Sequence, residues 1–305
     1  MKKVIVLICL ASLSSPIFAD DDAFNLLNKM TQSLSQMSYK GTLVHVKNND
    51  VVTLKVSHTI ESGEEVERVE RLNEDGTPYS RKVTNYSLSK LPKFNKKMQA
   101  VYSFDLGAIK KIAARPCQLV VARPKDRMRY LQKFCVDTET SLLLDYTIID
   151  KSHKPIEQFM FTDVEVLEDV SAQVVSPSIS ILGSNSLMSN TVSQPVLSDK
   201  VAKADEKINW KLTETPTGFS LRKAPMMKQA QGEEIETEHY ILSDGLSSVS
   251  IFISEQTPNS KETSTRSGAL NVITYYKNNF AVTLVGAVPK ETLKNIFNNL
   301  QYTSE

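Results

Sequence analysis

Short motifs that mark common catalytic and metal sites are absent from this sequence of 305 residues. It has no Gly-x-Ser-x-Gly nucleophile turn, no His-Glu-x-x-His zinc motif, no phosphate-binding Gly-rich loop and no calcium-loop pattern. The four histidines are scattered, at His45, His58, His153 and His239. His45 and His58 fall on one predicted hairpin, where two surface histidines are more often incidental than a site. The sequence therefore predicts neither an enzyme nor a bound cofactor or metal.

An excess of either charge is also absent, since 36 Lys and Arg residues stand against 35 Asp and Glu. Loss of Lys2 and Lys3 with an export signal leaves the rest of the chain about neutral. Nucleic-acid-binding proteins normally carry a strong basic excess. We therefore expect no nucleic-acid partner.

No apolar run approaches the roughly 20 residues that a membrane-spanning helix needs. The main apolar stretch, at 4–13, follows Lys2 and Lys3 and precedes Pro16 and Ala19. This order of a positive start, a short apolar run and a small residue is typical of a cleaved signal peptide. We expect a signal peptide at 1–19 and a soluble mature protein in the periplasm.

Cysteines are few, and Cys9 leaves with the signal, so Cys117 and Cys135 remain. They stand symmetrically about a turn that is predicted near Asp126, between two predicted strands at 119–122 and 128–134. Directly opposed residues of a hairpin have Cβ atoms about 4.5–5.5 Å apart, which suits a disulfide. An oxidising compartment favours the bond over two buried free thiols. Zinc is disfavoured because two cysteines do not complete a four-ligand site.

The first half of the mature chain predicts one helix followed by many strands. Leu27, Met30 and Leu34 recur at helical spacing within 20–36, and the acidic residues at its start suit the helix dipole. Residues 64–72 fit a helix or a strand equally well. Further strands are expected at 41–47, 51–58, 79–83, 100–104, 141–149 and 156–166. Such a run indicates a large antiparallel sheet, curved or partly closed into a barrel, over 20–170.

Residues 171–207 lose all periodicity and read as an interdomain linker. A small α+β domain is expected at 208–305. It contains two hairpin signals, with turns at 243–245 and 277–279, and a closing helix after Pro289. The fold class is therefore α+β, with a large N-terminal and a small C-terminal domain.

Two charged clusters have no motif to explain them. Asp137, Glu139, Asp145 and Asp150 read as a solvated face, although a catalytic carboxylate pair stays open. The segment at 90–98 mixes basic and apolar residues, and it is either a solvated loop or a mobile flap for an anionic amphiphile. The flap consists of Lys90, Leu91, Lys93, Phe94, Lys96, Lys97 and Met98.

Four stretches of the sequence carry a resemblance to a known family. The run 137–159, beginning Asp-Thr-Glu-Thr, resembles the sigma-E factor regulatory protein family RseB/MucB. Ser38-Tyr-Lys-Gly-Thr-Leu-Val44 is similar to the first strand of that family. Pro216-Thr-Gly-Phe219 and Tyr240-Ile-Leu-Ser-Asp-Gly-Leu246 resemble its second domain. The resemblance runs in order over nearly the whole mature chain.

The resemblance implies both a fold and a role. The large domain is expected to resemble the lipoprotein carriers LolA and LolB, as an unclosed antiparallel barrel wrapped around helices with an apolar cavity. The protein is expected to be a negative regulator of the envelope stress response. It would bind the periplasmic segment of a membrane-spanning, RseA/MucA-like anti-sigma factor and shield it from site-1 proteolysis. Lipopolysaccharide or a similar amphiphile would release it, and a homodimer is left open.

Two other functions remain as alternatives. A periplasmic lipid or lipoprotein carrier needs the same barrel, but it does not need the separate unit at 208–305. A secreted hydrolase would have to use unrecognised acids such as Asp137 and Glu139.

Overall fold

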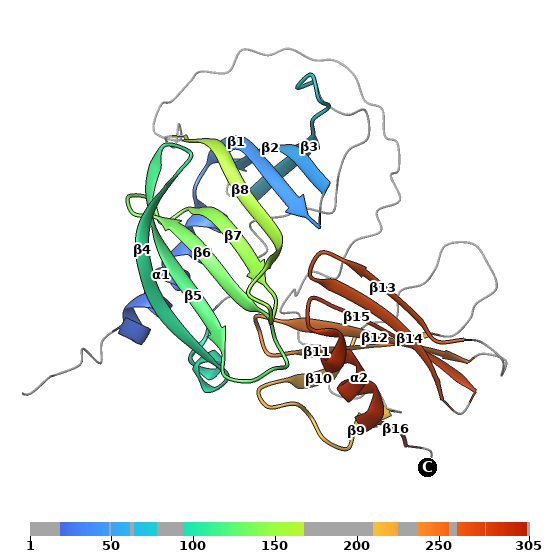
Figure 1. Ribbon diagram of the computed structural model, residues 1–305. Coiled ribbons are helices and arrows are strands. Elements are labelled where there is room, and N and C mark those ends of the chain that lie inside the picture. Colours follow the sequence, from blue (N-terminus) through green and yellow to red (C-terminus); the bar gives the residue numbers. More distant parts are fainter. Residues whose placement is uncertain are drawn as a thin grey trace, which may run out of the picture.

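The computed structural model describes residues 19–48, 50–61, 64–77, 94–167, 210–224, 237–255, 261–277 and 279–303. These residues form a large unit (19–167) and a small unit (210–303), each with its own antiparallel sheet and apolar core (Figure 1). Residues 1–18 of the predicted signal peptide, the predicted strand at 79–83 and the predicted linker at 171–207 lie outside the described residues. Within those residues, no helix combines the length and the apolar character that crossing a membrane requires.

In its described residues, the large unit consists of one helix, a short 3-10 helix and eight strands. The elements are α1 (Ala19–Gln36), β1 (Tyr39–Lys47), β2 (Asp50–Glu61), β3 (Glu64–Arg71), η1 (Lys96–Ala100), β4 (Tyr102–Ile112), β5 (Arg115–Pro124), β6 (Leu131–Asp137), β7 (Leu143–Ile149) and β8 (Pro155–Val166). The sheet order is β3-β2-β1-β8-β7-β6-β5-β4, and every neighbouring pair is antiparallel. β3 and β4 are free edges, so the sheet is not closed.

Helix α1 supplies one side of the large core. Its predicted apolar stripe, Leu27, Met30 and Leu34, is completely buried against the sheet. Phe24 adds an edge-to-face contact with Phe104 of β4, with ring centroids 5.7 Å apart. The predicted helix at 20–36 is therefore confirmed, and it packs along one face of the sheet (Figure 1).

The cysteine hairpin is present, but its register was predicted wrongly. Cys117 faces Asp137, while Leu119 faces Cys135, because residues 125–130 form a longer turn than expected. The two cysteines are therefore diagonal neighbours rather than directly opposed. Their Cα atoms are still only 5.3 Å apart, and the Cys117–Cys135 disulfide is formed.

The ambiguous segment at 64–72 is a strand, because its backbone pairs with β2 from Leu54 to Glu61. The strand predicted at 100–104 is displaced and much longer. Ala100 ends η1, and β4 then continues to Ile112. The second half of β4 is exposed at the sheet edge, so it lacks the alternation by which half-buried strands are recognised.

The small unit contains eight strands in two sheets and one helix among its described residues. The elements are β9 (Trp210–Leu212), β10 (Ser220–Lys223), β11 (Thr237–Ser243), β12 (Ser248–Glu255), β13 (Thr263–Ser267), β14 (Leu270–Lys277), β15 (Phe280–Gly286), α2 (Lys290–Asn299) and β16 (Leu300–Tyr302). The main sheet has the order β10-β11-β12-β15-β14-β13, and β9 pairs with β16 beside it.

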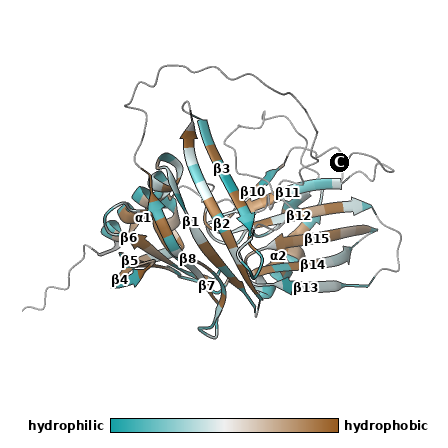
Figure 2. Cartoon of the chain, turned by 90° about the horizontal axis from the view of Figure 1, so that it is seen from above, coloured by the Kyte–Doolittle hydropathy of each residue, from teal (hydrophilic) through white to brown (hydrophobic). Residues whose placement is uncertain are grey.

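The small core lies between the main sheet and α2. Leu293 and Ile296 of α2 are completely buried with Ile251 and Leu284 of the sheet, and Trp210 joins them. Both predicted hairpins are present, as β11–β12 and β14–β15. Seen from above, the sheet of the large unit lies beside the main sheet of the small unit. Hydrophobic and hydrophilic residues alternate along the strands of both sheets (Figure 2).

Candidate functional site at the junction of the two units

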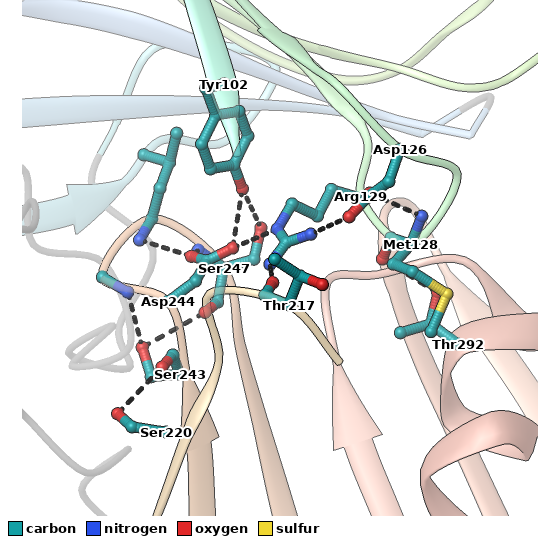
Figure 3. Close-up of polar contacts among 12 residues, drawn as sticks. Tyr102, Asp126, Met128, Arg129, Thr217, Ser220, Ser243, Asp244, Ser247 and Thr292 are labelled. Carbon is teal, nitrogen blue, oxygen red and sulfur yellow. Dashed lines mark hydrogen bonds and ion pairs between the residues drawn. The ribbon is translucent and has the colours of Figure 1, made fainter. Parts of the chain in front are cut away.

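A completely buried arginine joins the two units. Arg129 lies in the β5–β6 turn of the large unit, and its side chain reaches into the small unit (Figure 3). Its Nε donates to the carboxylate of Asp244, its Nη1 to Asp126, and its Nη2 to the carbonyl oxygen of Thr217 at 2.5 Å. The guanidinium also lies 4.3 Å from the ring centroid of Phe219. We call this set the Arg129 contact.

Asp244 is the matching group in the small unit, and it is also completely buried. Its Oδ1 accepts hydrogen bonds from the backbone N–H groups of Leu246 and Ser247, at 2.8 and 2.7 Å. Its Oδ2 accepts from Arg129 and from the hydroxyl of Tyr102 at 3.0 Å. The turn between β11 and β12 therefore holds the carboxylate in place before the large unit meets it.

The electrostatics of this contact favour the charged form of Arg129. Burial alone would lower the pKa of Arg129, but the bonds and charges of Asp244 and Asp126 outweigh it and raise that pKa. Burial and the negative charge of Asp244 also raise the pKa of Tyr102, so its hydroxyl stays protonated as a donor. A buried ion pair of this kind is costly to break, because either partner alone is an unpaired charge.

Close backbone approach at Gly245 completes the Arg129 contact. Gly245 has φ +95°, a conformation that side chains disfavour, and a β-carbon there would lie 2.5 Å from the Cε of Met98. The next residue, Leu246, packs against the core of the large unit. Three successive residues of this turn thus contact the large unit: Asp244 through its carboxylate, Gly245 through its backbone and Leu246 through its apolar side chain.

A second contact lies at the turn between β13 and β14. The carboxylate of Glu157 on β8 accepts from His45 Nε2 and from the backbone N–H of Ala269, both at 2.9 Å. Gly268 donates its N–H to Asn48 Oδ1 at 3.2 Å. Burial alone would raise the pKa of Glu157, but these hydrogen bonds hold it below its ordinary value. We call this set the Glu157 contact.

Apolar and polar groups fill the space between these contacts. Tyr130, Ile148 and Ala269 form a small buried cluster of their own. Asn271 donates to the hydroxyl of Tyr130 at 3.1 Å, and Thr292 donates to the carbonyl oxygen of Met128 at 2.8 Å. The junction is therefore continuous from the β11–β12 turn to α2 and the β13–β14 turn.

The interpretation of His45 and His58 as incidental surface residues was wrong. His45 is 3% exposed and stacks on Phe159, with centroids 4.0 Å apart. His58 is completely buried, where it bonds the carbonyl oxygen of Met37 at 2.7 Å and Glu65 at 3.1 Å. Their hydrogen-bond and stacking partners, which the sequence does not reveal, explain why both are inside.

The solvated face predicted for the acidic cluster is also wrong in part. Asp137 is buried against Arg115, with 2.7 Å between Nη2 and Oδ2, and Glu139 binds the same guanidinium at 3.1 Å. Burial alone would raise the pKa of Asp137, but Arg115 and Thr140 keep it below its ordinary value. Asp145 is buried beside Gln158, and burial raises its pKa. Ion pairing and hydrogen bonds thus account for these carboxylates.

The predicted flap is only partly within the described residues. Lys90, Leu91 and Lys93 lie outside them. Phe94 and Met98 are buried in the large core, while Lys96 and Lys97 are exposed on η1. Met98 lies at the Arg129 contact, so this end of the segment touches the small unit.

Sequence reasoning missed Arg129, Asp244 and Tyr102 as a site. Asp244 was assigned only to a turn, and Arg129 only to a strand. An arginine within a run expected to be half-buried was the one available signal, because a buried arginine requires a carboxylate partner. Which carboxylate it meets, 115 positions away in the chain, is not readable from one sequence.

Two family profiles match the chain. The MucB/RseB N-terminal domain matches residues 22–179, and the MucB/RseB C-terminal domain matches residues 204–301. These matches cover the large unit from residue 22 onward and the small unit up to residue 301. The chain belongs to the MucB/RseB family.

Named relatives agree with this assignment. The chain is 28% identical over 207 residues to the sigma-E factor regulatory protein RseB of Escherichia coli, covering 68% of this chain but only 61% of that protein. It is 24% identical over 281 residues to the sigma factor AlgU regulatory protein MucB of Pseudomonas aeruginosa, covering 83% and 81%. The structure of the Pseudomonas aeruginosa MucA/MucB complex matches with a TM-score of 0.68, at 21% identity, covering 93% of this chain and all of that one.

Proposed function

We propose that this protein is an exported, periplasmic negative regulator of a sigma-E-type envelope stress response. It binds the periplasmic segment of a membrane-spanning anti-sigma factor and shields that segment from site-1 proteolysis. Family membership and the titles of its relatives support this role. The observation that carries it is the buried junction, which supports a role in which both units face one partner together.

Binding and protection provide the test of this proposal. Calorimetry with the periplasmic segment of the anti-sigma factor from the same genome should detect a complex. Addition of the protein should also slow cleavage of that segment by the site-1 protease. The same segment with its residues in scrambled order is the control. A protein that binds neither segment, or that binds without slowing cleavage, would contradict the role.

We further propose that an anionic amphiphile such as lipopolysaccharide releases the partner. Linkage requires reciprocity: a tenfold weakening of partner binding by amphiphile implies a tenfold weakening in the reverse direction, about 1.4 kcal/mol. Calorimetry with and without lipopolysaccharide measures this coupling. Unchanged partner affinity at saturating lipopolysaccharide would favour a plain carrier or binding protein. Substitution of Lys93, Lys96 and Lys97 together by Ala tests whether the segment at 90–98 contributes to amphiphile binding.

We also propose that residues 20–170 and 208–305 are separate domains joined by a linker at 171–207, in a chain cleaved after its signal peptide at 1–19. The separate cores of the two units support this division. Limited proteolysis of the mature protein should cut first within 171–207 and yield two fragments. First cuts inside the large sheet would place the boundary elsewhere.

A further inference from the structure

A cavity of about 440 Å³ opens at the end of the large sheet, beside the Arg129 contact. The turns β5–β6 and β7–β8 form its walls. Asp126 and Arg129, which join the two units, also line it. An occupant of this cavity would therefore touch the group that holds the units together. We call it the turn pocket.

The two acids of the turn pocket are already used by the backbone of their own turns. Asp126 accepts a hydrogen bond from the N–H of Met128 at 2.9 Å, in addition to its ion pair with Arg129. Asp150 accepts from the N–H groups of Ser152 and Lys154, at 2.8 and 3.0 Å. Their oxygens hold the turns in shape, and the four cations that line the pocket, Arg123, Arg127, Arg129 and Lys151, outnumber these two acids.

The cations of the turn pocket are comparatively free. Arg127 is exposed, and no hydrogen bond or ion pair joins it to any residue in the described part of the chain. Arg123 meets only Asp105, at 3.6 Å and with both side chains about half exposed. Lys151 pairs with Glu291 at 3.2 Å on the surface, where such pairs contribute little. The pocket therefore carries positive charge with spare donors.

The apolar part of the turn pocket is formed by Leu131 and Ile149. Ile149 is buried and Leu131 is half-buried, so together they make a small apolar floor beneath the charged rim. A ligand that combines an anion with a short apolar portion would satisfy both regions. An acidic peptide would use the rim, but its polar backbone would face the floor without hydrogen-bond partners.

We propose that the turn pocket binds the phosphate group of an anionic amphiphile. Arg123 and Arg127 would donate paired hydrogen bonds to the phosphate oxygens, a geometry that guanidinium groups favour. Leu131 and Ile149 would contact the carbon atoms next to the phosphate. The inference rests on the proposed release by amphiphile, and it assigns to that release a site that shares Arg129 with the junction.

Direct binding to the full mature chain tests this site without any anti-sigma segment. Calorimetry would use dihexanoylphosphatidic acid below its micelle-forming concentration. Arg123→Gln/Arg127→Gln should weaken its binding at least tenfold. Lys110→Gln/Lys111→Gln, which removes the same charge from exposed positions on β4 outside the pocket, should leave it within twofold. Arg123→Lys/Arg127→Lys keeps the charge but loses the paired donors, and should give an intermediate loss.

Two further probes separate the sources of the anion. Inorganic phosphate should bind more weakly than phosphatidic acid, because it lacks the apolar portion. Dihexanoylphosphatidylcholine should also bind more weakly, because its choline compensates the phosphate charge. Equal affinity for phosphatidic acid in the wild type and in Arg123→Gln/Arg127→Gln would overturn the proposal. So would an arginine-dependent affinity for an acidic hexapeptide that exceeds the affinity for phosphatidic acid.

These outcomes are separable from the proposed function. If the anti-sigma segment fails to bind while phosphatidic acid binds in an arginine-dependent way, the site stands and the regulatory role does not. If the segment binds and phosphatidic acid does not, the role stands and the site does not. All substituted positions are exposed, and unchanged thermal unfolding of each variant verifies its fold.

Discussion

The Arg129 contact and the Glu157 contact fasten the same two units in different ways. At the first, side chains of both units meet as buried opposite charges. At the second, a carboxylate of the large unit meets a backbone N–H of the small unit, and its second oxygen stays with His45 inside the large unit. Loss of one group at the first contact strands a charge, while loss at the second removes a hydrogen bond. The Arg129 contact and the Glu157 contact should therefore differ in their sensitivity to substitution and to pH.

Breaking the Arg129 contact should produce the largest effect. Asp244→Ala leaves Arg129 buried without its main partner, and removing one member of a buried pair typically costs about 3–5 kcal/mol. Denaturant unfolding of the mature chain measures the loss. Asp105→Ala, which breaks the exposed pair with Arg123, is the control and should cost less than about 1 kcal/mol. Equal small losses in both variants would contradict the importance of burial.

Removing the disulfide should affect the large unit and leave both contacts intact. Cys117 and Cys135 are 18 positions apart, and opening a loop of this length costs about 3 kcal/mol in the chain-entropy model. Unfolding is compared with and without reductant. Trp210 is the only tryptophan and is buried in the small unit, so its fluorescence follows that unit separately from circular dichroism. A shift in both signals by the same amount would mean that the junction couples the units completely.

The Glu157 contact should respond to pH. Its pKa is lowered in the folded protein, so Glu157 stabilises the fold above its ordinary pKa, and this stabilisation is lost as pH falls through the lowered value. Glu157→Gln should cost about 1–2 kcal/mol at neutral pH. That difference from the wild type should shrink as pH falls from neutral through the lowered pKa of Glu157. A constant difference across this range would exclude ionisation as its source.

The smallest effect is expected from the exposed bridge between the units. Lys151 and Glu291 pair at 3.2 Å, with side chains that are 45% and 74% exposed. Lys151→Ala should cost no more than about 1 kcal/mol, and any cost should disappear in high salt. Unfolding at two salt concentrations tests this, with Asp244→Ala as the salt-insensitive reference.

Local patterns in the sequence predicted local structure well. The stripe of Leu27, Met30 and Leu34 identified α1, and both turn signals of the small unit identified hairpins. The cysteine pair was also identified, although its register was not, because turn length cannot be read to a single residue. The exposed second half of β4 shows the opposite case, since a stretch of strand without a buried face leaves no periodic pattern.

The candidate site was largely hidden from sequence reasoning. Asp244 and Gly245 were visible only as turn residues, and their contacts with Arg129 and Met98 depend on how two separate units dock. The same holds for His45 and Glu157, which come together only because β1 pairs with β8. Residues that act across such long separations carry no signal in the composition or spacing of their own segment.

The pairing of β1 with β8 also sets an order of assembly. β1 is among the first elements of the chain, yet its partner on one side ends at Val166. The hairpins of β1–β3 and of β4–β8 can form locally, but the large sheet becomes continuous only when nearly 170 residues have emerged. Contacts of such long range are slow to form, because closing the chain between them costs entropy first. The Arg129 contact also needs Asp244, so Arg129 lacks its partner from the small unit until that unit has been synthesised and has docked.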